Sequence, residues 1–322
     1  MKKGKDSVGV ARQWCGRLGK VENCQVGVFA VLCHGQRHIP LDARLYLPKE
    51  WTQDRGRCRK AGIPNETIVP RSKAEHALAM VKQARADGVR FAWVGLDGGY
   101  GKEPWLLRAF DAAGETFVAD IHKSQIIYPT DPQPRVPPAS SGRGRRPARL
   151  QAQTDGIRGD QWPAQQPPTA WQRITLRDST RGKLRVDVLT QRVWLWDGEE
   201  APAQCWHLIV RREVGARNEI KFTLSNAAVD TPIERLAVMQ GQRFWVERSF
   251  QDAKSSCGMA DYQVRRWSGW HHHMAMVMLA MLFMAEERVA QRNVEPLPLL
   301  SGQSPHSFNW LGFMSVSDLS VV

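Results

Sequence analysis

The sequence lacks the features of a secreted or membrane-spanning protein. Its six cysteines are scattered and never form a Cys-x-x-Cys pair, so neither a zinc ribbon nor a disulfide scaffold is indicated. The longest apolar run covers only residues 274–285, which is too short to cross a bilayer. Met1-Lys2-Lys3 leads into no apolar stretch, so we expect no signal peptide. These absences predict a cytoplasmic protein without a membrane partner.

Acidic residues are too few to balance the basic ones. The 322-residue chain has 45 Lys plus Arg against 32 Asp plus Glu, which gives a formal net charge of +13. An excess of this size favours a polyanionic partner, because Lys and Arg bind phosphates and release counterions. Nucleic acid is therefore the first partner to consider. The alternative is a basic surface that only keeps the protein in solution.

Residues 24–125 show an alternation of strand-like and helical patterns. Strands are predicted at 26–33, 39–47, 89–96 and 116–119, and helices at 72–87 and 105–113. The first two strands flank a turn-like His34-Gly35-Gln36 and read as a hairpin. The strand at 89–96 is apolar and ends at Asp97, so an acid lies at its carboxyl end. The alternation predicts an α/β fold with a central mixed sheet and flanking helices.

The composition changes sharply after residue 130. Residues 131–168 are rich in Pro, Gly, Ser and Gln and carry an arginine cluster at 143–149, which is typical of a flexible basic loop. Strand-like segments follow at 171–176, 184–196, 205–213 and 220–225, and helical patterns at 231–256 and 267–291. We expect the tail from Pro296 to be loosely held.

The predicted helix at 231–256 carries the most informative spacing. Thr231, Pro232 and Glu234 fit an N-cap, a first helical position and a capping box. Further along, one stripe of the helix holds Arg243, Glu247, Gln251 and Lys254. Such a stripe is most often a solvated face with ion pairs between residues four apart. The alternative is a functional face.

Several motifs together resemble the DDE transposases of bacterial insertion sequences. Arg243-x3-Glu247-x6-Lys254 is similar to the Tyr-x2-Arg-x3-Glu-x6-Lys signature of the insertion-sequence-four superfamily, and Asp97-x-x-Tyr100-Gly101 also matches. The segments at 2–13, 45–51 and 258–270 resemble its seven-hundred-and-one branch. The resemblance extends to about residue 290. It implies a ribonuclease H-like mixed sheet with flanking helices and a β-rich insertion between the second Asp and the Glu.

The resemblance also implies a chemistry and a site. Clustered carboxylates in such enzymes hold two Mg²⁺ or Mn²⁺ ions that activate the attacking oxygen and stabilise the leaving oxygen in phosphoryl transfer. Asp97 would be the second catalytic carboxylate and metal ligand, and Glu247 the third. The implied contacts to DNA phosphates come from four basic residues, Arg243, Lys254, Arg265 and Arg266. The alternative to a catalytic role is that Asp97 only forms a turn before two glycines.

Two departures from the family pattern affect this interpretation. Gln240 stands where the signature has Tyr. The first catalytic Asp, which the family places shortly before the Lys-Lys-Gly segment, is not found, so we expect an N-terminally truncated and impaired copy. Asp120 could substitute as a ligand, although an ordinary strand-end acid is the favoured alternative. Without the first strand, the hairpin at 24–47 should expose an unpaired edge.

The sequence thus predicts four parts. They are the first part of a ribonuclease H-like core (1–125), a basic loop with a β-insertion (126–230), the catalytic and C-terminal helices (231–292) and a loose tail (293–322). The predicted function is metal-dependent cleavage and strand transfer of transposon-end DNA by a homodimer, in the cytoplasm and associated with the nucleoid. The alternatives are a non-catalytic fragment that binds DNA or intact transposase, and a general nuclease without preference for inverted-repeat ends.

Overall fold

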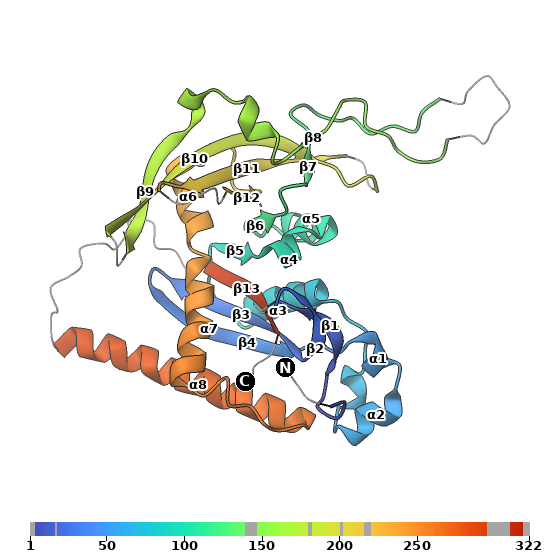
Figure 1. Ribbon diagram of the computed structural model, residues 1–322, viewed down its shortest axis with the longest axis vertical. Coiled ribbons are helices and arrows are strands. Elements are labelled where there is room, and N and C mark those ends of the chain that lie inside the picture. The colour runs from blue at the N-terminus through green and yellow to red at the C-terminus, as the bar shows by residue number, and fades with distance from the viewer. Residues whose placement is uncertain are drawn as a thin grey trace. The chain divides into compact units, whose positions relative to one another are not determined.

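The computed structural model describes residues 4–16, 18–138, 147–179, 182–199, 202–215, 220–294 and 310–317. The chain divides into two compact units, unit 1 (1–94 and 242–322) and unit 2 (95–241), coloured by residue number in Figure 1. These boundaries differ from the four predicted parts, and one falls inside strand β5 (Trp93–Leu96). Most of the predicted arginine cluster at 143–149 lies outside the described residues.

Unit 1 draws its elements from both ends of the sequence. Its strands, besides the start of β5, are β1 (Ala11–Cys15), β2 (Lys20–Cys24), β3 (Val26–His34), β4 (Arg37–Leu45) and β13 (Trp310–Ser317). Its helices are α1 (Lys49–Thr52), α2 (Arg55–Lys60), the 3-10 turn η1 (Asn65–Thr67), α3 (Lys73–Ala86), α7 (Phe244–Ser256) and α8 (Trp267–Val294). The predicted hairpin and the predicted helices at 72–87 and 267–291 are confirmed.

Strand β3 lies between two antiparallel partners. One edge pairs with β4, and the other pairs with β13 along its whole length, from Trp310 opposite Cys33 to Ser317 opposite Val26. Two expectations are therefore wrong. The second edge of β3 is not left unpaired, and residues 310–317 of the expected loose tail form a strand within the sheet. A local reading of the sequence could not show that a segment so far along the chain pairs with β3.

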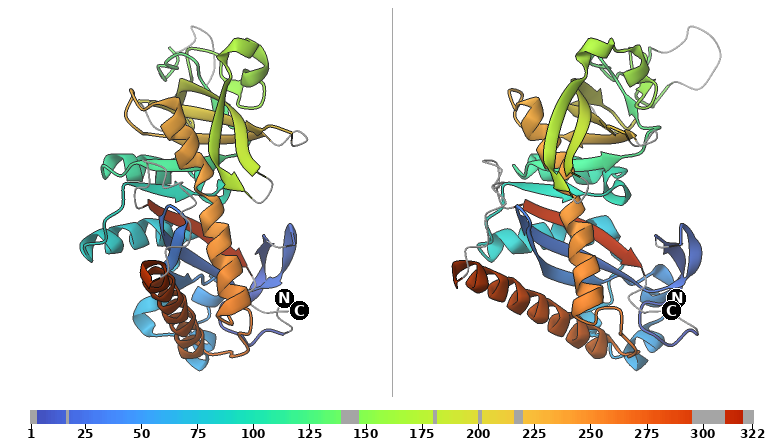
Figure 2. Two further views of the ribbon diagram at one scale, coloured as in Figure 1. Left: turned by 90° about the vertical axis from the view of Figure 1, so that its left-hand side faces the viewer. Right: turned by 60° about the vertical axis from the view of Figure 1, so that its left-hand side comes forward.

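Large apolar side chains fix β13 in place. Trp310 is 1% exposed and stacks on Trp93 with ring centroids 5.9 Å apart and planes 4° from parallel. Helix α7 lies across β3, β4 and β13, as both views in Figure 2 show. Its approach needs Gly312, because a Cβ there would lie 2.3 Å from Cγ2 of Val246. The core of unit 1 thus depends on a strand from the far end of the chain.

Unit 2 is mainly a β-sheet with short helices. Its strands after β5 are β6 (Phe117–Ile121), β7 (Ile126–Ile127), β8 (Ile157–Arg158), β9 (Gln172–Ser179), β10 (Gly182–Leu195), β11 (Gln204–Glu213) and β12 (Ile220–Ser225). Its helical segments are α4 (Gly98–Gly101), α5 (Pro104–Ala112), η2 (Trp162–Gln165), η3 (Pro168–Ala170) and α6 (Ile233–Gly241). The four strands predicted between 171 and 225 are confirmed.

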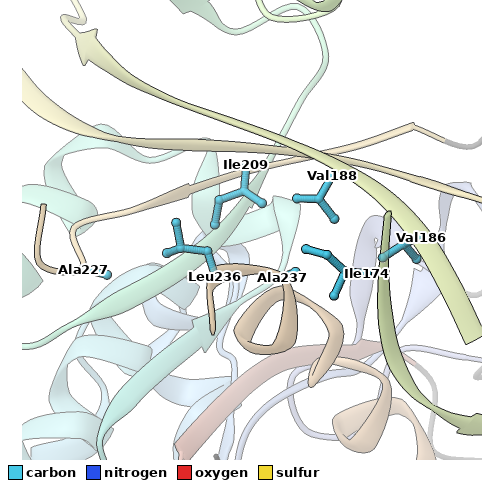
Figure 3. Close-up of a cluster of buried hydrophobic side chains, with 7 residues drawn as sticks. All are labelled: Ile174, Val186, Val188, Ile209, Ala227, Leu236 and Ala237. Atoms are coloured by element: carbon cyan, nitrogen blue, oxygen red, sulfur yellow. The ribbon is translucent and has the colours of Figure 1, made fainter. Parts of the chain in front are cut away.

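Helix α6 closes the core of unit 2 against its sheet. The strands follow the order β6-β12-β11-β10-β9, with antiparallel pairing throughout. Leu236 and Ala237 of α6 pack against buried aliphatic side chains of β9, β10 and β11, as Figure 3 shows. The mixed α/β architecture of the chain is compatible with the fold class expected from the sequence.

The single helix predicted over 231–256 is two helices. Helix α6 begins at Ile233 and ends at Gly241, and α7 begins at Phe244. The carbonyl of Pro232 accepts the hydrogen bond from the amide of Leu236, so the helical turns start beside the predicted cap at Thr231. None of the helices within the described ranges is long and apolar enough to cross a membrane.

Replacing Trp310 by Ala should destabilise the protein strongly. The change removes the ring that stacks on Trp93 and leaves a cavity beside β13, which typically costs about 3–5 kcal/mol for a buried Trp. Chemical denaturation followed by circular dichroism measures the loss. Trp310→Phe keeps an aromatic ring and should cost clearly less. Equal stability of Trp310→Ala and the wild type would show that β13 does not support the core.

Candidate active site

Asp97 lies at the end of a fully buried strand. All four residues of β5 are buried, and Asp97, which follows them, is partly exposed. Its backbone is extended, and its Oδ1 accepts a hydrogen bond of 2.7 Å from the amide of Gly99, which caps α4. The predicted strand-end position is confirmed, and so is the local turn that Asp97 forms before the two glycines. One carboxylate oxygen is held in place by this cap.

The glycines after Asp97 let α4 lie directly against β6. A Cβ on Gly101 would lie 1.9 Å from the carbonyl oxygen of Asp120, and one on Gly99 would lie 2.9 Å from Oδ1 of Asp97. Gly98 has more room, because its Cβ would lie 3.8 Å from the same carbonyl. The motif therefore sets the position of Asp97 through close backbone packing.

Asp120 belongs to a hydrogen-bonded network inside unit 2. Its Oδ1 accepts a 2.8 Å bond from the hydroxyl of Thr223 on β12, and that hydroxyl accepts a 2.7 Å bond from Nε2 of Gln240 on α6. Thr223 and Gln240 are buried. The residue at the Tyr position of the signature is thus an internal one here. No local pattern in the sequence indicates these partners of Gln240.

Glu247 lies in the first turn of α7, on the side away from the core. The buried face of α7 carries Val246, Phe250 and Ala253, and the ring of Phe250 meets Phe29 edge-on at 5.2 Å. The side chain of Glu247 is 54% exposed, and its Oε1 lies 3.0 Å from Nη2 of Arg243. Because an exposed pair of this kind contributes little to stability, it leaves the carboxylate available to other cations.

The other predicted DNA contacts lie in the same unit as Glu247. Lys254 is in the last turn of α7 and is partly exposed. Arg265 and Arg266 are exposed and come just before α8. Asp97 belongs to unit 2, so it stays a prediction that Asp97 and Glu247 form one site. Within the described ranges, no group of three or more His, Cys, Asp or Glu side chains is placed to hold a metal ion.

A buried cluster fixes α7 against its neighbours and was missed by the sequence analysis. Asp252 on α7 is buried, and its Oδ2 lies 3.3 Å from Nε2 of His38 on β4. Arg248 lies 3.0 Å from Oδ1, and Arg288 on α8 lies 3.8 Å from Oδ2. Burial lowers the pKa of His38, while the hydrogen bond to Asp252 opposes that shift. Asp252 thereby links α7 to β4 and α8.

The comparisons with known proteins show the family of the chain. A protein-family model described as DDE superfamily endonuclease matches residues 1–183, which is more than half of the chain. The chain belongs to the DDE superfamily endonucleases. A search of curated proteins found no match. The matched region contains Asp97 and Asp120, and Glu247 lies beyond it.

Family membership implies a nuclease that acts on DNA by phosphoryl transfer, and such enzymes generally use divalent metal ions. The candidate residues fit such an ion in chemical kind, because Asp97 and Glu247 are partly or largely exposed carboxylates, and hard oxygen ligands suit Mg²⁺ and Mn²⁺. Within the described ranges, these carboxylates do not belong to a group of three or more potential metal ligands.

Gly101→Ala should destabilise unit 2 because the added methyl group would clash with its neighbours. Gly98→Ala should cause no such clash. The added methyl group at 101 overlaps the carbonyl of Asp120 and forces α4 away from β6, at a cost of about 1–3 kcal/mol. The methyl group at 98 meets that oxygen at ordinary contact distance. Thermal unfolding of both variants tests the difference. A Gly101→Ala variant as stable as Gly98→Ala would contradict the packing described for α4.

Asp252→Ala should cost far more than Arg248→Ala. The first change removes the carboxylate that a buried histidine and two arginines share. Breaking a buried ion pair typically lowers the free energy of unfolding by about 3–5 kcal/mol. The second removes a side chain that is 47% exposed, where losses stay within about 1 kcal/mol. Urea denaturation compares the two. Similar losses would mean that Asp252 does not anchor α7.

Proposed function

We propose that this chain is a transposase-type DNA endonuclease in which Asp97 and Glu247 act as catalytic carboxylates on transposon-end DNA. The family match carries the proposal, since it establishes the endonuclease class and includes the segment that ends at Asp97. Two features support it. Asp97 follows a buried strand and is held by a cap, and Glu247 lies on the exposed face of a helix whose other face is buried.

The proposal gives the carboxylates and the basic residues different roles. Asp97 and Glu247 would hold Mg²⁺ or Mn²⁺, two ions in an intact site, and the bound metal would activate the attacking oxygen and stabilise the leaving oxygen. Arg243, 3.0 Å from Glu247, and Lys254, near the other end of α7, would bind phosphates of the cut strand. Because Arg243 already pairs with Glu247, it would also orient that carboxylate.

The remaining features follow the resemblance to insertion-sequence transposases. The enzyme would act as a homodimer on paired transposon ends in the nucleoid and would join cut ends to target DNA. The strands β9 to β12 would be the insertion between Asp97 and Glu247.

A plasmid-nicking assay with Mg²⁺ or Mn²⁺ tests the catalytic roles. Asp97→Asn and Glu247→Gln should each lower the cleavage rate by about 100-fold or more, because each removes a metal-binding charge without changing shape. Glu66→Gln, an exposed acid in η1, is the matched control and should cleave like the wild type. Cleavage that persists in both site variants would overturn the proposal.

The same assay separates a second candidate function. A chain that only binds DNA or intact transposase is favoured by one observation, namely the formal net charge of +13. It predicts salt-dependent DNA binding that survives Glu247→Gln and no nicking by the wild type. A general nuclease would instead nick plasmids with and without inverted-repeat ends at equal rates.

A further inference from the structure

We propose that the β1–β2 hairpin of unit 1 is a DNA-binding ribbon, which lies in a groove of duplex DNA with Trp14 facing the bases. The inference rests on the proposed function for its ligand, because the endonuclease family acts on DNA. It assigns a binding surface to residues that the catalytic argument leaves without a role. The hairpin, β1 (Ala11–Cys15) and β2 (Lys20–Cys24), projects from the edge of its unit in both views of Figure 2.

The two faces of the hairpin differ in chemistry. Cys15 and Cys24 on the inner face are fully buried and pack with Val26 and Tyr46. Burial and the neighbouring Cys15 raise the pKa of Cys24 to about 11, so its thiol stays protonated. Nε2 of Gln13 donates to the carbonyl of Cys24 at 2.8 Å. The inner face therefore packs the hairpin against Val26 and Tyr46 of unit 1.

The outer face exposes large apolar side chains. Trp14 and Val21 are direct cross-strand partners, and they are 57% and 50% exposed. Leu18 in the connecting turn is 39% exposed. Arg12 lies on the same face as Trp14 and is exposed. An exposed Trp–Val pair beside Arg12 is typical of a surface that binds another molecule.

Charge identifies the partner as a polyanion. Arg12 is exposed on the outer face, and Lys20 is exposed at the turn end of the hairpin, where it pairs with Cys15. The one acid on these two strands, Glu22, lies 3.5 Å from Lys20. The backbone amide of Asn23 lowers the pKa of Glu22 most, and Lys20 and Arg12 lower it further, while burial opposes the shift. Helix α2 adds exposed Arg55, Arg59 and Lys60.

Hydrogen bonds place these further cations beside the chain that enters β1. Nη2 of Arg57 donates to the carbonyl of Lys5 at 2.6 Å, and Nε1 of Trp51 donates to the carbonyl of Val10 at 2.8 Å. The amide of Val8 donates to the carbonyl of Arg265 at 2.9 Å. Helix α2 and the segment at 265–266 therefore lie next to residues 5–10, which lead into β1. Asp6 and Asp54 also lie there, one near Arg265 and the other capping α2.

Among polyanions, duplex DNA suits the hairpin because its major groove is wide enough for two strands. The major groove of B-DNA admits a two-stranded β-ribbon, and apolar side chains there contact thymine methyl groups. Flanking cations on α2 and at 265–266 can then reach phosphates on either side, which sets position but not sequence. Trp14 and Val21 would make the base contacts, and Arg12 and Lys20 the nearest phosphate contacts.

Fluorescence anisotropy with a labelled mixed-sequence duplex, in chelator and without added metal, tests the proposal. Trp14→Ala should weaken binding about fivefold or more, as expected when an aromatic contact to bases is lost. Arg12→Gln with Lys20→Gln should lower the slope of log affinity against log salt by about two. The matched control, Trp105→Ala, removes a tryptophan of 36% exposure from α5 and should bind like the wild type.

The outcomes separate this inference from the nuclease proposal. Because the assay measures binding without metal, reduced binding by the hairpin variants supports the ribbon even if the wild type never nicks a plasmid. Wild-type affinity in both hairpin variants would overturn the ribbon and leave the nuclease proposal intact. Absence of duplex binding by the wild type would also overturn it. Val21→Thr, which keeps a β-branched side chain, should weaken binding without loss of thermal stability, so misfolding cannot imitate the result.

Discussion

Strand β3 needs hydrogen-bonding partners along both edges, and the structure of unit 1 depends on how that need is met. A buried strand with an unpaired edge would leave backbone groups without partners. β4 covers one edge and β13 covers the other. Once β13 is in place, Trp310 meets Trp93, and Gly312 admits Val246 of α7. The helix that carries Glu247 thus lies on a surface that the end of the chain completes.

The two candidate carboxylates are held by different means. Asp97 is positioned by backbone packing, since glycines allow α4 to approach β6 and the cap bond fixes one oxygen. Glu247 is positioned by its helix, which Asp252 and His38 anchor on the other side. Each arrangement leaves the carboxylate partly exposed, which suits a ligand for a metal ion that must also meet DNA. Under the proposed function, the basic residues of unit 1 would bind phosphates that Glu247 alone would repel.

The proposed catalytic carboxylates would cut DNA, and the proposed hairpin surface would bind it. A nuclease that cuts a polyanion must bind the duplex over a larger area than its metal site covers. The β1–β2 ribbon and the cations around its base extend the basic surface of unit 1 to residues that take no part in the chemistry. This also explains why Trp14 and Val21, which would be stabler if buried, remain on the outside.

Local patterns in the sequence determined the strand that ends at Asp97, the helix capped by Ser72, the strands between 171 and 225 and the apolar face opposite Glu247, because each depends on neighbours within a few residues. Only the tertiary structure decided that 310–317 pairs with β3, that the helix divides near Gln242, and that Gln240 and Asp252 are internal. These features depend on hydrogen bonds and packing between distant segments, and no periodicity in the sequence records which segments meet.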